Sequence, residues 1–226
     1  MKAWVQDNAS LVTLTSGNSI SHIGSSLECI YFPITSVIVS VAELDDNQCL
    51  CVGLIGNEGM LGIDLIPSNK NGRLKFKVIV SGTALSINKR LFLKYVAACK
   101  ETDSLIRHYF SMTMHQNIRN AACCYLHDAR QRLSRCLLTF GQKLHSSELS
   151  LTHSDLGDLL GIRRNTVTGF AHALQKEGLI SYSRGHIFLS SQSALIRASC
   201  PCYEDEKSHQ EDFFKHHGHW RYDTRN

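Results

Sequence analysis

The sequence predicts an α+β protein in which antiparallel strands come first, a long helix follows, and a small mixed domain ends the chain. Three observations support this order. Residues 27–55 are rich in β-branched and aromatic residues and are interrupted by Asp45-Asp46-Asn47, which is typical of a hairpin. Residues 89–145 contain no proline and a single glycine, which favours helices. Residues 179–191 alternate again as two short strands about Arg184-Gly185.

Composition and charge indicate a globular chain with one positive region. The 226 residues are 43% hydrophobic and 19% charged, enough for one large domain or two ordinary ones around a packed core. The formal net charge is +4. Residues 126–198 hold nine lysines and arginines against five acidic residues, so the whole positive excess lies there.

The nine cysteines are predicted to be reduced, because the first residues lack a secretion signal and no long apolar run suggests a membrane span. We expect a cytoplasmic protein without a membrane partner. The spacings Cys49-x-Cys51, Cys123-Cys124 and Cys200-Pro-Cys202 match no zinc-finger pattern. No metal site is therefore predicted, and buried thiols are the favoured interpretation.

The first predicted domain spans residues 1–102. Residues 11–88 contain strand-like segments separated by glycines, which predicts antiparallel strands closing into a barrel or roll.

The long helix predicted over residues 103–126 carries an apolar stripe. Its members recur at helical spacing and are Leu105, Ile106, Tyr109, Phe110, Met114 and Ile118. The stripe either packs on the strands or forms the seam of a dimer. We expect a homodimer, because a helix this long extends beyond a small barrel and would leave apolar residues in water.

A second domain is predicted over residues 127–200. Thr152 followed by Asp155 is typical of a helix N-cap, and Gly161 can end that helix because glycine takes positive φ readily. A second helix is expected over residues 163–177. Helix, glycine turn, helix and basic hairpin, in this order, predict a winged helix-turn-helix.

The second helix begins with Arg163-Arg164-Asn165-Thr166, a composition suited to DNA. Arginine offers two parallel donors to guanine, asparagine can pair with adenine, and threonine hydroxyls with helix amides can hold phosphate. We interpret this surface as DNA-binding rather than as a merely solvated helix face. The residues expected to contact double-stranded DNA are Thr152, Arg163, Arg164, Asn165, Thr166, Thr168, His172, Arg184 and His186.

Residues 126–191 resemble the DNA-binding domain of the Crp/Fnr superfamily of bacterial transcription regulators. The resemblance is carried by Leu151, Thr152, Leu156, Leu160, Gly161, Arg164, Thr166, Val167, Leu174, Gly178, Leu179, Ile180 and residues 182–187. It implies that Arg164 and Asn165 read bases, that Thr166 contacts phosphate, and that a homodimer binds a palindromic site and RNA polymerase. Asn165 stands where many members have Glu, and Gly169 where many have a second arginine, so a different preferred site is expected.

Residues 11–125 are similar, with lower specificity, to the sensory β-roll and dimerisation helices of the same superfamily, a cyclic-nucleotide-binding-like arrangement. Cyclic-nucleotide binders there carry a Gly-Glu segment followed by Arg-Ser/Thr-Ala, which holds the phosphate. This chain has Gly56-Asn57-Glu58-Gly59 and Arg73-Leu74-Lys75, so we do not expect cyclic AMP to bind. An iron-sulphur cluster of the Fnr kind is also not expected, because the first cysteine is Cys29. No cofactor is predicted.

The C-terminal segment offers two further features. Cys200 and Cys202 precede Tyr203; a structural role is favoured over a metal or redox one, because two ligands two residues apart cannot complete a tetrahedral site without donors from elsewhere. Residues 201–226 form a polar tail crowded with histidines, which predicts disorder.

The sequence-based conclusion is a transcription regulator that is not an enzyme. One alternative is a cyclic-nucleotide or other small-ligand receptor that acts through protein partners, which would need an intact cassette. A second alternative is a thiol enzyme with a pair such as Cys124 and His127, which would need an activated thiolate in a cleft.

Overall fold

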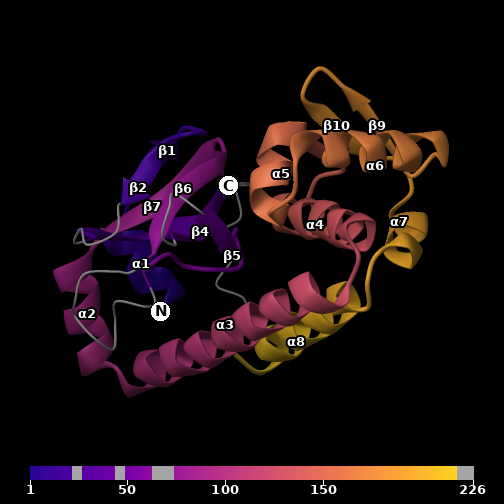
Figure 1. Ribbon diagram of the computed structural model, residues 1–226. Helices are drawn as coiled ribbons and strands as arrows, with labels where there is room; N and C mark the ends of the chain where they lie inside the picture. The colour runs from indigo at the N-terminus through magenta and orange to yellow at the C-terminus, as the bar shows by residue number, and fades with distance from the viewer. Residues whose placement is uncertain (22–26, 44–48, 63–73, 218–226) are drawn as a thin grey trace.

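The computed structural model describes residues 1–21, 27–43, 49–62 and 74–217, and its arrangement is drawn in Figure 1. A short helix, α1 (Lys2–Asn8), opens the chain. The strands that follow are β1 (Ser10–Leu14), β2 (Ser19–Ser21), β3 (Cys29–Pro33), β4 (Val37–Glu43), β5 (Cys49–Ile55), β6 (Lys75–Val80) and β7 (Gly82–Asn88). The helices that follow them are α2 (Lys89–Ala98), α3 (Lys100–Leu126), α4 (Ala129–Leu144), α5 (His153–Leu160), α6 (Arg164–Lys176), α7 (Gln192–Ala198) and α8 (Cys202–His217). Three short strands lie among these helices: β8 (Glu148–Ser150), β9 (Ile180–Ser183) and β10 (His186–Leu189).

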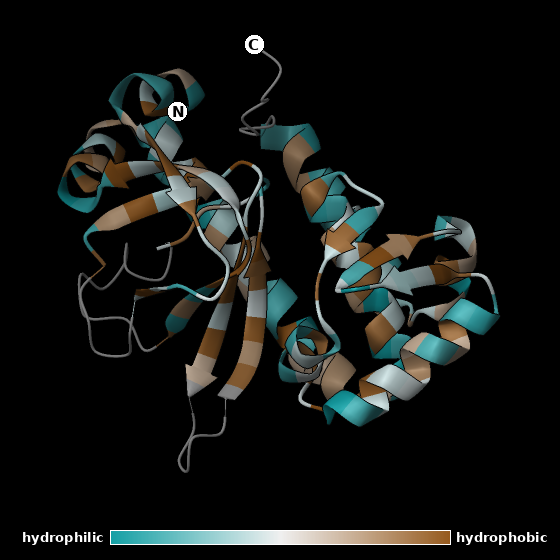
Figure 2. Ribbon diagram, turned by 90° about the horizontal axis from the view of Figure 1, so that it is seen from above, coloured by the Kyte–Doolittle hydropathy of each residue, from teal (hydrophilic) through white to brown (hydrophobic). Residues whose placement is uncertain are grey.

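The N-terminal strands form two antiparallel sheets, in the orders β1-β7-β3 and β2-β6-β4-β5. Burial alternates along β3 and β6, because successive side chains of a strand point to opposite faces. Ile30, Phe32, Phe76 and Val78 are the inward members. Figure 2 shows the resulting bands of hydrophobic and more polar residues along the strands. The prediction of an antiparallel β-roll is confirmed.

Helix α3 is 27 residues long, or about 40 Å at 1.5 Å per residue, and it runs from the roll to the C-terminal domain (Figure 1). Its first half packs on the roll: the Tyr109 hydroxyl accepts a hydrogen bond of 3.0 Å from the Met60 amide. Ile106, Tyr109 and Met112 belong to a buried cluster with Phe92 of α2. None of the helices in the described ranges is long and apolar enough to cross a membrane.

The polar tail that was predicted to be disordered instead contains helix α8, which lies alongside α3 (Figure 1). Tyr203, Gln210 and Phe214 are buried, and their spacings of seven and four residues place them on one face of the helix. The other faces are charged, so composition alone concealed the amphipathic pattern. Residues 218–226 of this predicted tail lie outside the described residues.

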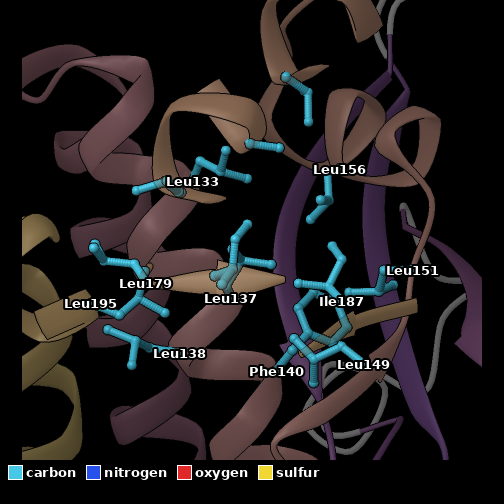
Figure 3. Close-up of a cluster of buried hydrophobic side chains, with 14 of the residues drawn as sticks. Leu133, Leu137, Leu138, Phe140, Leu149, Leu151, Leu156, Leu179, Ile187 and Leu195 are labelled. Atoms are coloured by element: carbon cyan, nitrogen blue, oxygen red, sulfur yellow. The ribbon is translucent and has the colours of Figure 1, made fainter. Parts of the chain in front are cut away.

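The C-terminal domain combines helices α4 to α7 with a three-stranded sheet in the order β8-β10-β9. Its core is formed by branched aliphatic side chains and one phenylalanine from all of these elements. Figure 3 shows ten of them converging: Leu133, Leu137, Leu138, Phe140, Leu149, Leu151, Leu156, Leu179, Ile187 and Leu195.

This core continues into the roll, which fixes the domain against the N-terminal half. Val37, Val39 and Ile79 of the roll belong to the same buried cluster as the leucines of the C-terminal domain. Lys143 of α4 also forms an ion pair with Glu58, and both side chains are only 6% exposed. Apolar contacts and a buried ion pair therefore join the two domains.

Candidate DNA-binding interface

Helices α5 and α6 are separated by a tight turn that the sequence specifies locally. The Thr152 hydroxyl accepts a hydrogen bond of 3.1 Å from the Asp155 amide, and the Asp155 carboxylate accepts one of 2.9 Å from the Thr152 amide. This capping box fixes the start of α5. Gly161 then adopts φ 65°, a left-handed conformation that glycine takes without strain, and the chain turns into α6.

Helix α6 has one buried face and one exposed face. Val167, Ala171 and Leu174 are buried in the domain core. The predicted DNA-contacting residues of this helix and its N-cap are all exposed, namely Arg163, Arg164, Asn165, Thr166, Thr168 and His172. No side chain caps the N-terminus of α6. Its first amides therefore face outward, where the positive end of the helix dipole favours an anion.

The wing is the hairpin of β9 and β10. These strands pair in the register His186 with Ser183 and Leu189 with Ile180, which leaves a two-residue loop of Arg184 and Gly185. Both loop residues have positive φ, 46° and 85°, as a tight hairpin turn requires. Arg184 is exposed at the tip. The predicted hairpin, with its cation at the end, is present in the structure.

Three of the predicted DNA contacts have partners inside the domain. The Thr152 hydroxyl donates to the Asp155 carboxylate at 2.6 Å, and the Thr168 hydroxyl donates to the Arg164 carbonyl at 3.0 Å. The His186 Nδ1 lies 3.1 Å from a carboxylate oxygen of Glu148 on β8. These three side chains are also exposed, but their polar atoms already have partners within the domain.

His153 is a component of this region that sequence reasoning missed. Its ring stacks on Tyr182 with centroids 4.2 Å apart, and its Nδ1 lies 3.0 Å from the Thr168 hydroxyl. It thereby joins α5, α6 and the wing. Burial, together with the nearby Arg164 charge, lowers the pKa of His153 below its usual value. The sequence carried no signal for this role, because the ring contacts residues that are distant along the chain.

The charges of the domain divide into paired and unpaired groups. Arg130 pairs with Glu177, Arg135 pairs with Glu206, and Lys143 pairs with Glu58. Within the part of the chain that the structure describes, Arg163, Arg164 and Arg184 form no ion pair. Arg132, Lys176 and Arg197 also form no ion pair with the described residues, but Arg163, Arg164 and Arg184 are exposed on α6, its N-cap and the wing, the two elements that would face a polyanion.

The predicted dimer stripe is divided by the structure. Ile106 and Tyr109 are 3% and 4% exposed within the chain, so their assignment to a dimer interface is wrong: they pack on the roll. Leu105 and Phe110 are half-buried against the same cluster. Met114 and Ile118 are 48% and 59% exposed, which leaves them accessible to another molecule.

A cavity of about 450 Å³ lies between the roll, α3 and the C-terminal domain. Its wall includes Glu58, Tyr109, Asn117 and Arg132. Glu58 belongs to the degenerate cassette identified in the sequence, and its carboxylate is occupied by Lys143. Arg73, the other cassette residue, lies outside the described residues.

Comparison with known proteins matches residues 131–198 to the Crp-like helix-turn-helix domain. The whole fold is similar to three solved structures at 16–17% sequence identity. FixK2 from Bradyrhizobium japonicum has a TM-score of 0.74, with 85% of this chain and 98% of that chain covered. A CRP-family transcriptional regulator from Thermus thermophilus has 0.70, with 83% and 96% covered. The c-di-GMP responsive global regulator CLP of Xanthomonas campestris has 0.66, with 84% and 98% covered. No curated protein sequence matches the chain.

The helix-turn-helix and wing, with their unpaired arginines, define a DNA-binding regulator. Residues 131–198 match the Crp-like helix-turn-helix domain, and the roll and long helix in front of them complete a fold similar to that of the three solved structures.

Proposed function

We propose that the protein binds a two-fold symmetric DNA site as a homodimer, with α6 of each protomer in the major groove. The observation that carries this proposal is the uncapped N-terminus of α6. Arg163 and Arg164 are exposed there without ion-pair partners among the described residues, and Asn165 is exposed beside them. Helices of this class read base edges with their N-terminal residues. Arg164 is assigned to a guanine, Asn165 to an adenine and Thr166 to a phosphate.

The wing supplies a contact of a different kind. Arg184 lies at the tip of the hairpin, where its φ is 46°, and its side chain is exposed. A cation placed there meets the sugar-phosphate backbone, which carries charge but no base identity. We therefore assign specificity to α6 and general affinity to the wing.

The dimer seam is assigned to the second half of α3. Exposed apolar residues recur there with steps of four, three and four, as Met114, Ile118, Ala121 and Tyr125. Such spacing forms a continuous seam between two helices. Tyr125 is 90% exposed and Leu126 is 69% exposed, which is costly for a helix end that has no partner. Asn120 in this half of α3 still donates to the Val52 carbonyl of β5 at 3.3 Å, so the seam uses only the exposed positions of the helix.

Selection of bound fragments from random DNA tests the proposal. We expect a pseudo-palindrome whose half-site centres lie one helical turn, roughly 10 to 11 base pairs, apart. Arg164→Ala should relax the preference at one base pair in each half-site and weaken specific binding by about 1–3 kcal/mol. Arg90→Ala is the matched control, because Arg90 is an exposed arginine on α2 at the far end of the molecule (Figure 1). A consensus that Arg164→Ala leaves unchanged would show that α6 is not the reading helix.

The cavity is proposed to exclude cyclic AMP and cyclic GMP. Its volume suits a small molecule, but the Glu58 carboxylate is already held by Lys143, and the cassette lacks its usual arginine context. Calorimetry with both cyclic nucleotides should give no heat of binding at physiological concentrations. Micromolar affinity for either one would contradict this.

RNA polymerase is proposed as the protein partner on the strength of the Crp/Fnr type alone. Transcription in vitro from a promoter carrying the selected site should change when the protein is added. An identical effect on a promoter without the site would argue against specific regulation.

A further inference from the structure

Four potential metal ligands meet where α3 ends and α8 begins. The Cys123 Sγ lies 3.5 Å from the Cys200 Sγ, and the Cys202 Sγ lies 3.6 Å from the His127 Nδ1. The four donor atoms all lie within 4.8 Å of one another. Cys123 and Cys200 are buried, while His127 and Cys202 are half-buried. The cluster is thus closed on one side and reachable from the other.

These separations suit one tetrahedral ion. With Zn–S bonds of about 2.3 Å and a Zn–N bond of about 2.0–2.1 Å, tetrahedral geometry places two sulfurs about 3.8 Å apart and a sulfur and a nitrogen about 3.6 Å apart. Two of the six separations, 3.5 Å and 3.6 Å, are already close to these values, and the others, all within 4.8 Å, need to shorten by up to roughly 1 Å. Four donors this close together surround a single ion.

The secondary structure explains why the donors converge. Cys123 and His127 are four residues apart at the end of α3, so they lie on the same side of the helix. Cys200 and Cys202 flank Pro201, at the start of α8. Each pair supplies half of a tetrahedral site, and the packing of α8 on α3 brings the halves together.

A cationic side chain lies beside the cluster. Arg135 of α4 donates to Glu206 of α8 at 2.8 Å, and it also interacts with Cys123. Three thiolates and a divalent ion carry a net charge of −1, which a guanidinium at this position offsets.

We propose that Cys123, His127, Cys200 and Cys202 bind one Zn²⁺ ion per chain. Three thiolates and one imidazole are a preferred ligand set of tetrahedral zinc. All four positions are taken by the protein, so the ion is structural and leaves no open position for catalysis. It holds α8 against the last turn of α3, next to residues 127–128, where the chain passes into the DNA-binding domain.

The histidine of this cluster is not available to the thiol-enzyme alternative raised by the sequence. His127 faces Cys202 at 3.6 Å, whereas Cys124 is exposed. No metal site was expected from the sequence, because Cys200 and Cys202 supply only two ligands. The two further donors, Cys123 and His127, lie at the end of α3, and His127 precedes Cys202 by 75 residues.

Cobalt substitution of the reduced full-length protein tests this proposal. Co²⁺ added to the metal-stripped wild type should give intense tetrahedral d–d bands and a thiolate-to-cobalt charge-transfer band that saturate at one ion per chain. Zn²⁺ should then abolish both. Cys202→Ser should lose most of the charge-transfer intensity and bind more weakly, whereas Cys124→Ser should behave as the wild type. Cys124 is the matched control because it is an exposed neighbour of Cys123.

Other outcomes overturn the proposal. Weak octahedral bands without charge transfer would assign binding to the histidines of the C-terminal region. A wild-type spectrum that Cys202→Ser leaves unchanged would place the ion elsewhere. Loss of two free thiols in the untreated protein, with no zinc detected by elemental mass spectrometry, would identify a Cys123–Cys200 disulfide instead. If a variant fails to fold, the cobalt spectrum of the wild type still tests the proposal. None of these measurements depends on DNA binding.

Discussion

Two arginines of the C-terminal half show how differently the same residue type is used in two regions. Arg164 is exposed at the start of α6 and forms no ion pair with the described residues. Arg135 is 12% exposed and bonds to Glu206 and Asn120 beside the cysteine cluster. Burial alone would lower the pKa of Arg135, but the Glu206 carboxylate raises this pKa above its usual value. The first arginine is available to an external polyanion, and the second stabilises the junction of three helices.

A charged side chain can bind another molecule only where the fold leaves that side chain exposed and unpaired. On the DNA-facing surface the arginines remain solvated until they bind, so removing one changes affinity and leaves stability nearly unchanged. At the buried pairs, removal of one partner leaves a desolvated charge, which costs stability.

The largest effect is expected at the buried ion pair between the domains. Lys143→Met leaves the Glu58 carboxylate buried without its partner, so the free energy of unfolding should fall by about 3–5 kcal/mol. Urea denaturation measures it. The double variant Lys143→Met with Glu58→Gln should recover part of the loss, because no charge then remains buried. If Lys143→Met were as stable as the wild type, the ion pair between Lys143 and Glu58 would contribute nothing to stability.

The next largest effect is expected at the proposed dimer seam. Ile118→Glu puts a charge on an apolar seam, so the dimer should dissociate and affinity for the full palindrome should fall by about 100-fold or more, because the second half-site no longer binds at high effective concentration. Light scattering and gel shift on the same sample measure both. Ser104→Glu, an exposed position in the first half of α3, should change neither. A monomeric wild type would return Ile118 to an ordinary surface role.

A smaller effect is expected at the wing. Arg184→Ala should weaken specific and non-specific DNA equally and reduce the slope of log affinity against log salt by about 1, because one phosphate contact is lost. Binding measured over a range of salt concentrations gives the slope. Arg164→Ala should change the base preference, whereas Arg184→Ala should lower only the affinity. A changed base preference in the Arg184 variant would show that the wing also contributes to specificity.

The smallest effect concerns pH and His153. Its pKa in the folded protein lies below the unfolded value, so the unfolded chain binds the proton more readily. Stability should therefore decline as the pH falls through the ordinary histidine value of about 6.5 and level off below the folded pKa. Urea denaturation at neutral and mildly acidic pH should show this for the wild type and less of it for His153→Gln. Identical pH profiles would mean that other groups control the decline.

Much of the DNA-binding domain could be predicted because its signals are local. The capping box at Thr152, the positive φ of Gly161 and the tight turn at Arg184 depend on neighbours a few residues away, and each was visible in the chain. The alternation of the β-strands is also local. The recognition face followed from the 3.6-residue period of α6, which fixes the exposed positions once Val167, Ala171 and Leu174 are taken as the core.

The division of α3 could not be predicted in the same way. Apolar residues recur at helical spacing along the whole of α3, so the sequence predicts one continuous stripe. Only the packing of α3 on the roll determines that Ile106 and Tyr109 are buried while Ile118 is accessible. Helix α8 was missed because three widely spaced inward residues are too few to outweigh a polar composition. Its stability comes from packing on α3, which no local pattern records.

Local sequence patterns account for the order of the elements, for the cap, turn and wing of the DNA-binding domain, and for the position of the exposed arginines, because these follow from backbone preferences and periodicity within a few residues. Long-range packing determines which charges are paired, which part of α3 remains exposed, and that Cys123 and His127 lie close to Cys200 and Cys202. Those outcomes depend on contacts between residues that lie 47 to 85 positions apart, and the chain specifies them only through the collective packing of its core.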